Sequence, residues 1–345
     1  MTIFDLVTAE DIVAYWNTKA DQETENLLGD ELWDSEQKLG LDLKWIKGAK
    51  GLPVVLMPSA YDVAALKIDR IGFEKVSTEM PFFKNSVGID EELRQQLNMV
   101  LESGNQTYID AIMNRVFDDE MRLLRGARAQ RERMRMSLLT TGIISISANG
   151  QDYYYDYGMP QSHKVDATTS WKNPSADITG DIQAWQDLIE EDYGERPSRA
   201  VVSSTTLNYF VKNTNIRNAI LRNNTGVTVP KSEILAYILN EFKLSIGVYS
   251  KKYINEAGQK RAYMPDDLFV MIPSGKLGTG WFGTTPEQSD LMSGSAANVA
   301  ITDTGVAVTT SKKVDPVNVD TKVSMIYLPS FETIDGILQA DVDPS

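Results

Sequence analysis

The chain has 345 residues, enough to bury sizeable cores in two domains or in one elaborated domain. It contains no cysteine, which excludes disulfides and thiolate-based metal or redox chemistry. The formal net charge of −14 argues against a protein that grips nucleic acid through its phosphates, because such binding needs concentrated lysine and arginine. No apolar run approaches the ~20 residues that cross a bilayer, so no membrane partner is expected.

The first forty residues are predicted to form an arm. Thr8 and Asp11 have the spacing of a capping box for a short helix to about Lys19, and a second short helix is expected over residues 30–38. Neither helix is long enough to form a core with the other, yet the arm carries Trp16 and Trp33. We therefore expect residues 1–40 to pack on another surface.

Residues 41–89 alternate short β-prone pieces with turns at glycine and proline, which predicts an extended ribbon held out from the body. Charged residues occur along the whole ribbon. Its candidate contact residues toward neighbouring copies are Lys44, Lys47, Lys50, Lys67, Asp69, Arg70 and Glu74.

The longest predicted element is a helix over residues 108–139. Thr107 and Asp110 have capping-box spacing at its start, and Gly142 is the expected stop. At about 1.5 Å per residue the helix would be roughly 48 Å long, beyond the ~30 Å diameter of a small domain. A shorter helix is expected before it, over residues 91–102. The apolar residues that recur at helical spacing in the long helix are Ile109, Ile112, Met113, Val116, Leu123, Ala127, Met134 and Leu138.

The second half of the long helix is rich in arginine, and the first half is acidic, which complements the helix dipole. Two interpretations stay open: a solvated face with i,i+4 ion pairs, or a contact surface for a neighbouring subunit, where arginine is favoured. Gly126 costs about 1 kcal/mol relative to alanine in mid-helix, so it is the candidate hinge. The candidate interface residues of this helix are Arg122, Arg125, Arg128, Arg131 and Arg135.

The remaining chain is predicted to hold helices first and strands later. Asn149-Gly150 lies between two β-prone segments, a strong signal for a hairpin. Helices are expected over residues 177–193, 205–212, 216–221 and 231–242, and a strand is expected over 198–204. From Ser245 onward strands dominate. The pattern predicts an α+β fold, without the regular βαβ alternation of a parallel sheet.

Two motifs could indicate chemistry. Residues 278–283 spell GxGxxG, with Asp303 twenty residues farther on, but the helices of a dinucleotide-binding fold do not follow, and a glycine-rich turn is favoured. Asp303-Thr304-Gly305 resembles the tripeptide of aspartic proteases, whose chemistry needs two such carboxylates. The sequence has no second copy of the tripeptide, so a turn between two strands is favoured.

Two further polar positions are expected to have no chemical role. His163 is expected to be solvated in a loop, and residues 341–343 are expected to fray. No catalytic residue, metal site or cofactor is predicted.

The order of these elements resembles the major capsid protein of tailed phages, specifically the lambda-type capsid protein E family with the Hong Kong 97 (HK97) fold. The stretch MRLLRGARAQRERMRMSLLTTGIISI is similar to the family's spine helix entering its hairpin. SWKNPSADITGDIQAW resembles the family's tryptophan and acidic helix, and GERPSRAVVSSTTLNYFVKNTNIRNAI resembles its next strand and helix. YSKKYINEAGQKRAYMPDDLFVMIPSGKLGTGWFG is similar to a hairpin, a strand and a glycine-rich piece. The resemblance covers about residues 25–340.

The resemblance implies a domain organisation. The N-arm would be residues 1–40, the extended E-loop 41–89, the peripheral (P) domain 90–175 with about 301–330, the axial (A) domain 176–300, and the C-terminal segment 331–345. It also implies pentamers and hexamers that form the icosahedral capsid of a virion around double-stranded DNA, assembled in the host cytoplasm. Scaffolding and portal proteins are the expected partners, and a decoration protein is a further candidate.

The physical pattern agrees with this resemblance, because an arm and a ribbon that lack cores of their own should wrap neighbouring copies. A strongly acidic chain also suits a container wall that does not retain its DNA. An encapsulin-type compartment shell is the related alternative. A nucleotide-binding or aspartic-protease-like enzyme is the alternative from another class.

Overall fold

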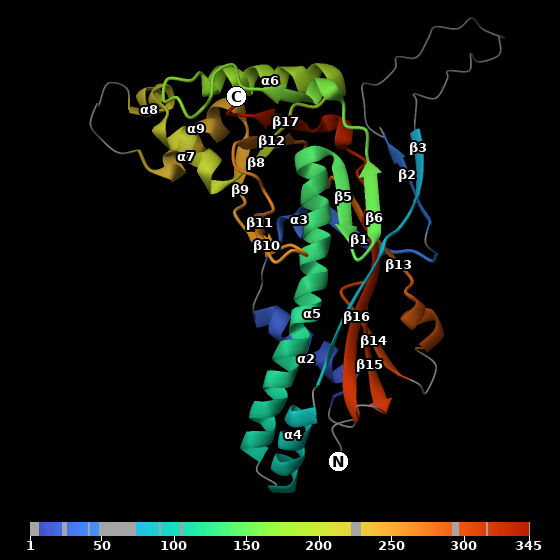
Figure 1. Ribbon diagram of the computed structural model, residues 1–345. Coiled ribbons are helices and arrows are strands. Elements are labelled where there is room, and N and C mark those ends of the chain that lie inside the picture. The colour runs from blue at the N-terminus through green and yellow to red at the C-terminus, as the bar shows by residue number, and fades with distance from the viewer. Residues whose placement is uncertain are drawn as a thin grey trace, which may run out of the picture. The chain divides into compact units, whose positions relative to one another are not determined.

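The computed structural model describes residues 7–22, 26–40, 42–47, 74–89, 91–103, 106–221, 229–291, 297–314 and 317–344 (Figure 1). The chain divides into two compact units. Unit 1 comprises Met1–Leu43, Ser77–Glu132 and Thr279–Ser330. Unit 2 comprises Lys44–Val76, Arg133–Gly278 and Phe331–Ser345. Each unit has its own sheet, in which strands that are far apart in the sequence pair with one another. This arrangement, with helices and mostly antiparallel strands, is an α+β fold.

Unit 1 is built on a six-stranded sheet in the order β1-β13-β16-β15-β14, with β4 also paired to β16. The long strand β16 pairs with three others, all antiparallel: β15 and then β13 lie along one side of it, and β4 lies along the other. Its inner residues, such as Val308, Met325 and Tyr327, are buried. The strands are β1 (Trp33–Gln37), β4 (Phe82–Gly88), β13 (Gly278–Gly283), β14 (Asn298–Thr302), β15 (Val306–Val314) and β16 (Val317–Pro329).

The glycine-rich segment 278–283 is the strand β13, so the expectation of a turn is wrong there. Glycine serves close packing in this strand, because a Cβ at Gly283 would lie 2.6 Å from Cγ2 of Ile326. The dinucleotide fingerprint fails for the same reason, since its glycines must form a turn before a helix.

The arm begins with α2 (Ala9–Gln22), and the predicted capping box is confirmed. The Thr8 hydroxyl accepts from the Asp11 amide at 3.2 Å and donates to the Asp11 carboxylate at 2.6 Å. The second helix is shorter than expected: α3 (Leu28–Leu32) gives way to the strand β1. The prediction of a helix over 30–38 is wrong because pairing with β13 overrides local helix propensity.

The ribbon is described only at its two ends. Strands β2 (Asp42–Lys47) and β3 (Glu74–Glu79) form a two-stranded sheet. Residues 80–89 then return to the body of unit 1, where β4 joins the main sheet. Of the candidate contact residues, Lys44, Lys47 and Glu74 belong to these strands, while Lys50, Lys67, Asp69 and Arg70 lie outside the described residues.

Two helices follow, α4 (Glu91–Ser103) and the long α5 (Gln106–Thr141). The long helix is confirmed, two residues longer at each end than predicted, and it begins in unit 1 and ends in unit 2 (Figure 1). Because it already begins at Gln106, Thr107 lies inside the helix and the predicted capping box at Thr107 and Asp110 is wrong. Its expected stop is confirmed too: Gly142 has a φ of 74° and donates its N–H to the Leu138 carbonyl at 2.9 Å.

The hairpin after α5 is confirmed, with β5 (Ile143–Ala148) antiparallel to β6 (Gln151–Asp156). The two turn residues Asn149 and Gly150 have φ values of 53° and 72°. Both therefore occupy the left-handed region that Asn-Gly tolerates better than other pairs, which explains why these two residues specify the turn.

Unit 2 holds a five-stranded sheet in the order β7-β17-β12-β8-β9. The last strand of the chain pairs with both β12 and β7, so residues 338–341 form an inner strand and the predicted fraying of the terminus is wrong. The strands are β7 (Lys164–Asp166), β8 (Arg199–Val202), β9 (Ser245–Val248), β12 (Leu268–Ile272) and β17 (Leu338–Asp341). A separate hairpin joins β10 (Lys252–Ile254) to β11 (Lys260–Ala262).

Four helices share one hydrophobic core with this sheet (Figure 1). Trp171 is its centre: its ring lies 5.5 Å from Trp185, 5.2 Å from Phe210 and 5.3 Å from Phe269, measured between centroids. Its indole N–H donates to Asp181 at 2.8 Å, which satisfies the polar edge of the buried ring. The helices are α6 (Ile178–Tyr193), α7 (Ser204–Lys212), α8 (Thr214–Leu221) and α9 (Lys231–Phe242).

Replacing Gly126 with alanine is expected to stabilise α5 by about 1 kcal/mol. Gly126 is exposed in mid-helix, and a Cβ there would meet no heavy atom within 4 Å. Chemical denaturation followed by circular dichroism measures the change. A loss of stability would show that the helix needs the absence of a side chain at position 126. The role of Gly126 as a hinge stays a prediction.

Candidate functional site

Among the described side chains, the unit 1 part of α5 buries three charged ones: Glu120, Arg131 and Glu132 are 2%, 5% and 0% exposed. Glu120 and Arg131 fall on the helical spacing of the apolar stripe, at its two gaps between Val116 and Leu138. A buried charge is costly unless it is paired and hydrogen-bonded. The partners of these three groups therefore define the site that holds unit 1 together.

Asp303 is the partner of Arg131. Its carboxylate accepts from Arg131 Nη2 at 2.7 Å, from Arg128 Nε at 3.0 Å and from the indole N–H of Trp16 at 3.4 Å. Burial raises the pKa of Asp303, but the two guanidinium groups and the indole outweigh it and hold the pKa below its usual value. The carboxylate therefore stays ionised near neutral pH.

The turn that carries Asp303 is shaped for this role. Asp303 and Thr304 have φ values of 46° and 73°, and they join β14 to β15 as the sequence predicts. At Gly305 a Cβ would lie 2.5 Å from the Cβ of Phe282, so no other residue fits there. The Asp-Thr-Gly tripeptide is thus a structural turn that aims one carboxylate at two arginines.

The arm is held at the same place. The guanidinium of Arg128 lies 5.0 Å from the ring centroid of Trp16, in addition to its bond with Asp303. Both carboxylate oxygens of Glu132 accept from the Gly29 amide, at 3.0 and 3.1 Å. We call these six residues the arm latch: Trp16, Gly29, Arg128, Arg131, Glu132 and Asp303.

A polar pocket of about 270 Å³ lies beside the latch. Its walls come from the arm, α5 and the β14–β15 turn, all in unit 1. The lining residues are Asp30, Trp33, Asp34, Ser35, Arg128, Arg131, Asp303 and Thr304.

The two tryptophans of the arm are covered by their own chain, whereas Leu39 is 87% exposed. Trp16 and Trp33 are 3% and 1% exposed, and the Trp33 indole donates to the Ser330 carbonyl at 2.9 Å. The Ala9 amide donates to the Asn298 side chain at 2.6 Å, which fixes the start of α2. The argument that this arm needs neighbouring copies for cover is therefore wrong for Trp16 and Trp33.

Glu120 faces β16, where one carboxylate oxygen accepts from the Thr321 hydroxyl at 2.7 Å and the other is buried without a hydrogen-bond partner. Burial is the main cause that raises the pKa of Glu120 to about 7; the Thr321 hydrogen bond opposes it and the charge of Asp119 adds to it. Close by in the chain, Lys322 is already paired with Glu287 at 2.6 Å. Glu120 thus titrates near neutral pH inside unit 1.

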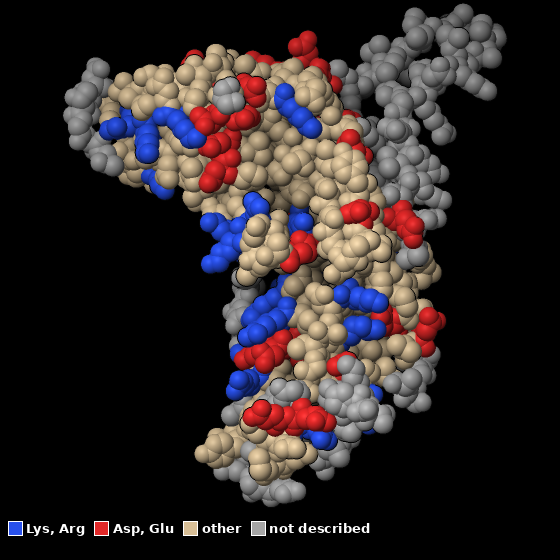
Figure 2. Space-filling view, viewed as in Figure 1, with Lys and Arg blue, Asp and Glu red and all other residues tan. Residues whose placement is uncertain are grey.

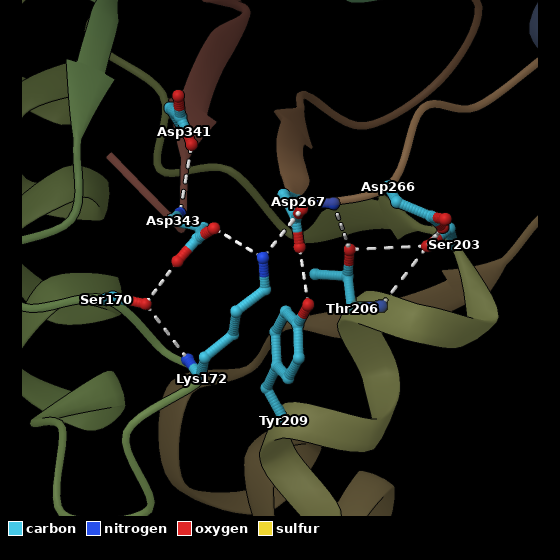
Figure 3. Close-up of polar contacts among 9 residues, drawn as sticks. All are labelled: Ser170, Lys172, Ser203, Thr206, Tyr209, Asp266, Asp267, Asp341 and Asp343. Atoms are coloured by element: carbon cyan, nitrogen blue, oxygen red, sulfur yellow. Dashed lines mark hydrogen bonds and ion pairs between the residues drawn. The ribbon is translucent and has the colours of Figure 1, made fainter. Parts of the chain in front are cut away.

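Unit 2 contains a second polar cluster (Figure 3). Lys172 bridges the carboxylates of Asp343 and Asp267, and Asp267 also accepts from the Tyr209 hydroxyl at 2.5 Å. The backbone adds to the connection, because the Val342 amide donates to the Asp267 carbonyl at 2.9 Å. These contacts tie residues 342–343 to the loop before β12, and through Asp267 to Tyr209 of α7.

The ionisation of the residues in this cluster suits a structural role. The hydrogen bonds to Asp343 and Asp267 raise the pKa of Lys172, which favours the protonated amine that pairs with these two carboxylates. Burial and the bond to Asp267 raise the pKa of Tyr209 to about 12. Asp343 has a lowered pKa because Lys172 and Ser170 bond to it. The described residues contain no group of His, Cys, Asp and Glu suited to a metal ion.

His163 is buried, against the expectation of a solvated loop residue. It ends the short 3₁₀ helix Gln161–His163, and its Nε2 lies 3.1 Å from the Asp192 carboxylate. The polar residues around it in the sequence concealed this, because burial of a loop depends on what packs over it.

The candidate interface arginines of α5 differ in their exposure to solvent. Arg122 and Arg125 are exposed, whereas Arg131 and Arg135 are buried and Arg128 is half-buried on Asp303. The expectation of an exposed arginine-rich half-helix is therefore wrong for the last three. A role at subunit contacts stays a prediction, and Arg122 and Arg125 are the two whose exposure suits it.

Two solved structures share this architecture. A putative capsid protein of a prophage of E. coli CFT073 matches with a TM-score of 0.61 at 14% identity, covering 97% of this chain and 99% of that one. A phage-related protein from Bordetella bronchiseptica RB50 matches with a TM-score of 0.55 at 11% identity, covering 97% of both chains. At these identities the likeness shows the fold alone, which is the HK97-like capsid fold. No match is found among curated proteins.

The family model described as phage major capsid protein E matches residues 8–342. The chain belongs to this family, which confirms the resemblance inferred from the order of its elements. The protein is accordingly a structural component of the phage head and of the virion, and not an enzyme. Within the described residues no helix combines the length and the apolar character that a bilayer crossing requires.

Proposed function

We propose that this chain assembles into pentamers and hexamers that form an icosahedral phage head around double-stranded DNA, in the host cytoplasm. The match of the capsid family over residues 8–342 carries the proposal. The net charge of −14 supports it, because an acidic wall repels the phosphates of the enclosed DNA. The DNA can then be packaged into the head and released from it without binding to the wall.

The domain boundaries belong to the same proposal: N-arm 1–40, E-loop 41–89, peripheral domain 90–175 with 301–330, axial domain 176–300, and C-terminal segment 331–345. We also propose a scaffolding protein, a portal protein and a decoration protein as partners.

Exposed aromatic and apolar side chains support association with other copies. Tyr154 on β6 is 65% exposed. Its two neighbours in the sequence, Tyr153 and Tyr155, lie on the opposite face of the strand, and their ring centroids are 6.4 Å apart. Met99 on α4 and Tyr108 on α5 are also exposed. Aromatic residues and methionine are enriched at protein interfaces, so these positions suit subunit contacts.

Electron microscopy of the purified protein, alone and co-expressed with a scaffolding protein, tests the proposal. Rings, tubes or closed shells are expected. Persistent monomers under every condition would contradict it. The content of closed particles separates the two shell types, since DNA indicates a phage head and a protein cargo indicates an encapsulin-type compartment.

Charge reversal at Arg122 and Arg125 is expected to weaken assembly and leave the subunit folded. Both lie on the exposed face of α5, and the ion pair between Arg122 and Asp119 at 3.4 Å joins side chains that are 77% and 44% exposed. Exposed pairs of this kind contribute only about 0.5 kcal/mol to stability. Sedimentation measures assembly and circular dichroism measures folding. Lys212→Glu/Lys231→Glu is the control of equal charge change, and equal assembly of both double variants would contradict the interface role.

A further inference from the structure

The hairpin β10–β11 in unit 2 is anchored through one of its two faces. The Tyr253 ring stacks on Tyr263 at 4.9 Å, and Tyr263 stacks on Tyr249 at 6.0 Å, measured between centroids. The guanidinium of Arg133 lies 5.6 Å from the centroid of Tyr253 and forms an ion pair with Glu256 in the hairpin turn. An isolated two-stranded hairpin is marginally stable in water, so this anchoring explains why the hairpin is ordered.

None of the described residues packs over the other face of the hairpin. Lys252 pairs with Ala262 and Ile254 with Lys260 across the strands, so these four side chains share one face. All four are exposed, and Ile254 is 68% exposed. Neither lysine has a carboxylate partner among the described residues. The result is a small face on which an apolar residue lies beside two lysines that form no ion pair with the described part of the chain.

This face is basic in a chain of net charge −14. Figure 2 shows lysine and arginine side chains gathered where the hairpin lies in Figure 1. Any second copy of the chain therefore approaches with an excess of carboxylates, and like-charged surfaces repel unless opposite charges are placed between them. The anchored basic face of the hairpin supplies those opposite charges.

We propose that the outer face of β10–β11, formed by Lys252, Ile254, Lys260 and Ala262, binds an acidic surface of a second copy of this chain. The inference rests on the proposed assembly function and assigns a partner to this face. The exposed isoleucine favours a protein surface over the DNA backbone, because an apolar side chain gains nothing from phosphates and is suited to the core of a protein interface.

The test compares Lys252→Glu/Lys260→Glu with wild type and with the control Lys212→Glu/Lys231→Glu, which changes net charge equally at two other exposed lysines. Nuclease-treated proteins are studied by sedimentation, and particles by electron microscopy. At low salt the hairpin variant should associate about tenfold more weakly than the control, because like charges now face each other. Near 1 M salt, where screening acts over about 3 Å, this gap should close.

Two further variants sharpen the result. Lys252→Arg/Lys260→Arg keeps the charge and should assemble as wild type does. Ile254→Ser should weaken association at both salt concentrations, since apolar contact is not screened. Circular dichroism checks that each variant folds.

Equal association of the hairpin variant and its control would overturn the inference, as would a difference that occurs only when DNA is added. If wild type forms shells and the hairpin variant forms them equally well, the inference fails while the assembly function stands. If wild type never associates under any condition, both fail together.

Discussion

Replacing Asp303 with asparagine is expected to lower the free energy of unfolding of unit 1 by about 3 kcal/mol, because Arg131 then stays buried without its counter-charge. The Arg131 side chain is 7% exposed and lies 2.7 Å from the Asp303 carboxylate. Asparagine has the shape of aspartate and tolerates the positive φ of 46°, so the change removes charge and little else. The arm should loosen as well, since Trp16 and Arg128 meet at the same carboxylate.

Chemical denaturation followed by tryptophan fluorescence measures the loss of stability, and hydrogen exchange of the α2 amides reports release of the arm. Asp187→Asn is the matched control, because Asp187 is 55% exposed and pairs with Arg196 at the surface. The control should change stability by less than about 1 kcal/mol. Equal effects of the two variants, or unchanged exchange in α2, would count against the latch.

Replacing Glu120 with glutamine is expected to stabilise unit 1 by about 3 kcal/mol at pH 8 and to have little effect near pH 4.5. The pKa of Glu120 is about 7 in the folded chain against 4.5 as its ordinary value. Between these values the unfolded chain has lost the proton and the folded chain keeps it. Folding therefore takes up a proton, and the stability that neutral Glu120 allows falls as pH rises through this window.

Urea denaturation of wild type and Glu120→Gln at pH 5 and pH 8 tests the expectation, because glutamine imitates the protonated side chain and can still accept from Thr321. Asp119→Asn is the control. Its charge is a smaller cause of the raised pKa than burial, so the pH dependence should largely survive. A difference between wild type and Glu120→Gln that does not grow with pH would show that the carboxylate is hydrated.

The latch was only partly predictable from the sequence. The gaps in the apolar stripe at Glu120 and Arg131 were visible, and a charged residue at a core position of a helix predicts a buried partner. The identity of that partner was not visible. Asp303 lies 172 residues from Arg131, and its own neighbours in the sequence indicated only a turn.

The arm shows the same division. Its apolar residues required cover, but the sequence could not say whether the cover came from this chain or from another copy. Segment 30–38 was predicted as a helix from its local pattern, and β1 formed instead because the edge of β13 was available to pair with it. Local propensity is a weak preference that tertiary pairing overrides.

The sequence by itself determined the elements whose causes are local: the capping box of α2, the length and stop of α5, the Asn-Gly hairpin and the α+β order of the chain. It also determined the family, because the order of such elements is specific even where each motif is modest. Only the tertiary structure decided which charges are buried and what pairs with them, where the arm is covered, and that residues 338–341 form an inner strand of a sheet. Those features depend on contacts between residues distant in the chain, and the free energy of such contacts is set by burial and geometry that no local pattern encodes.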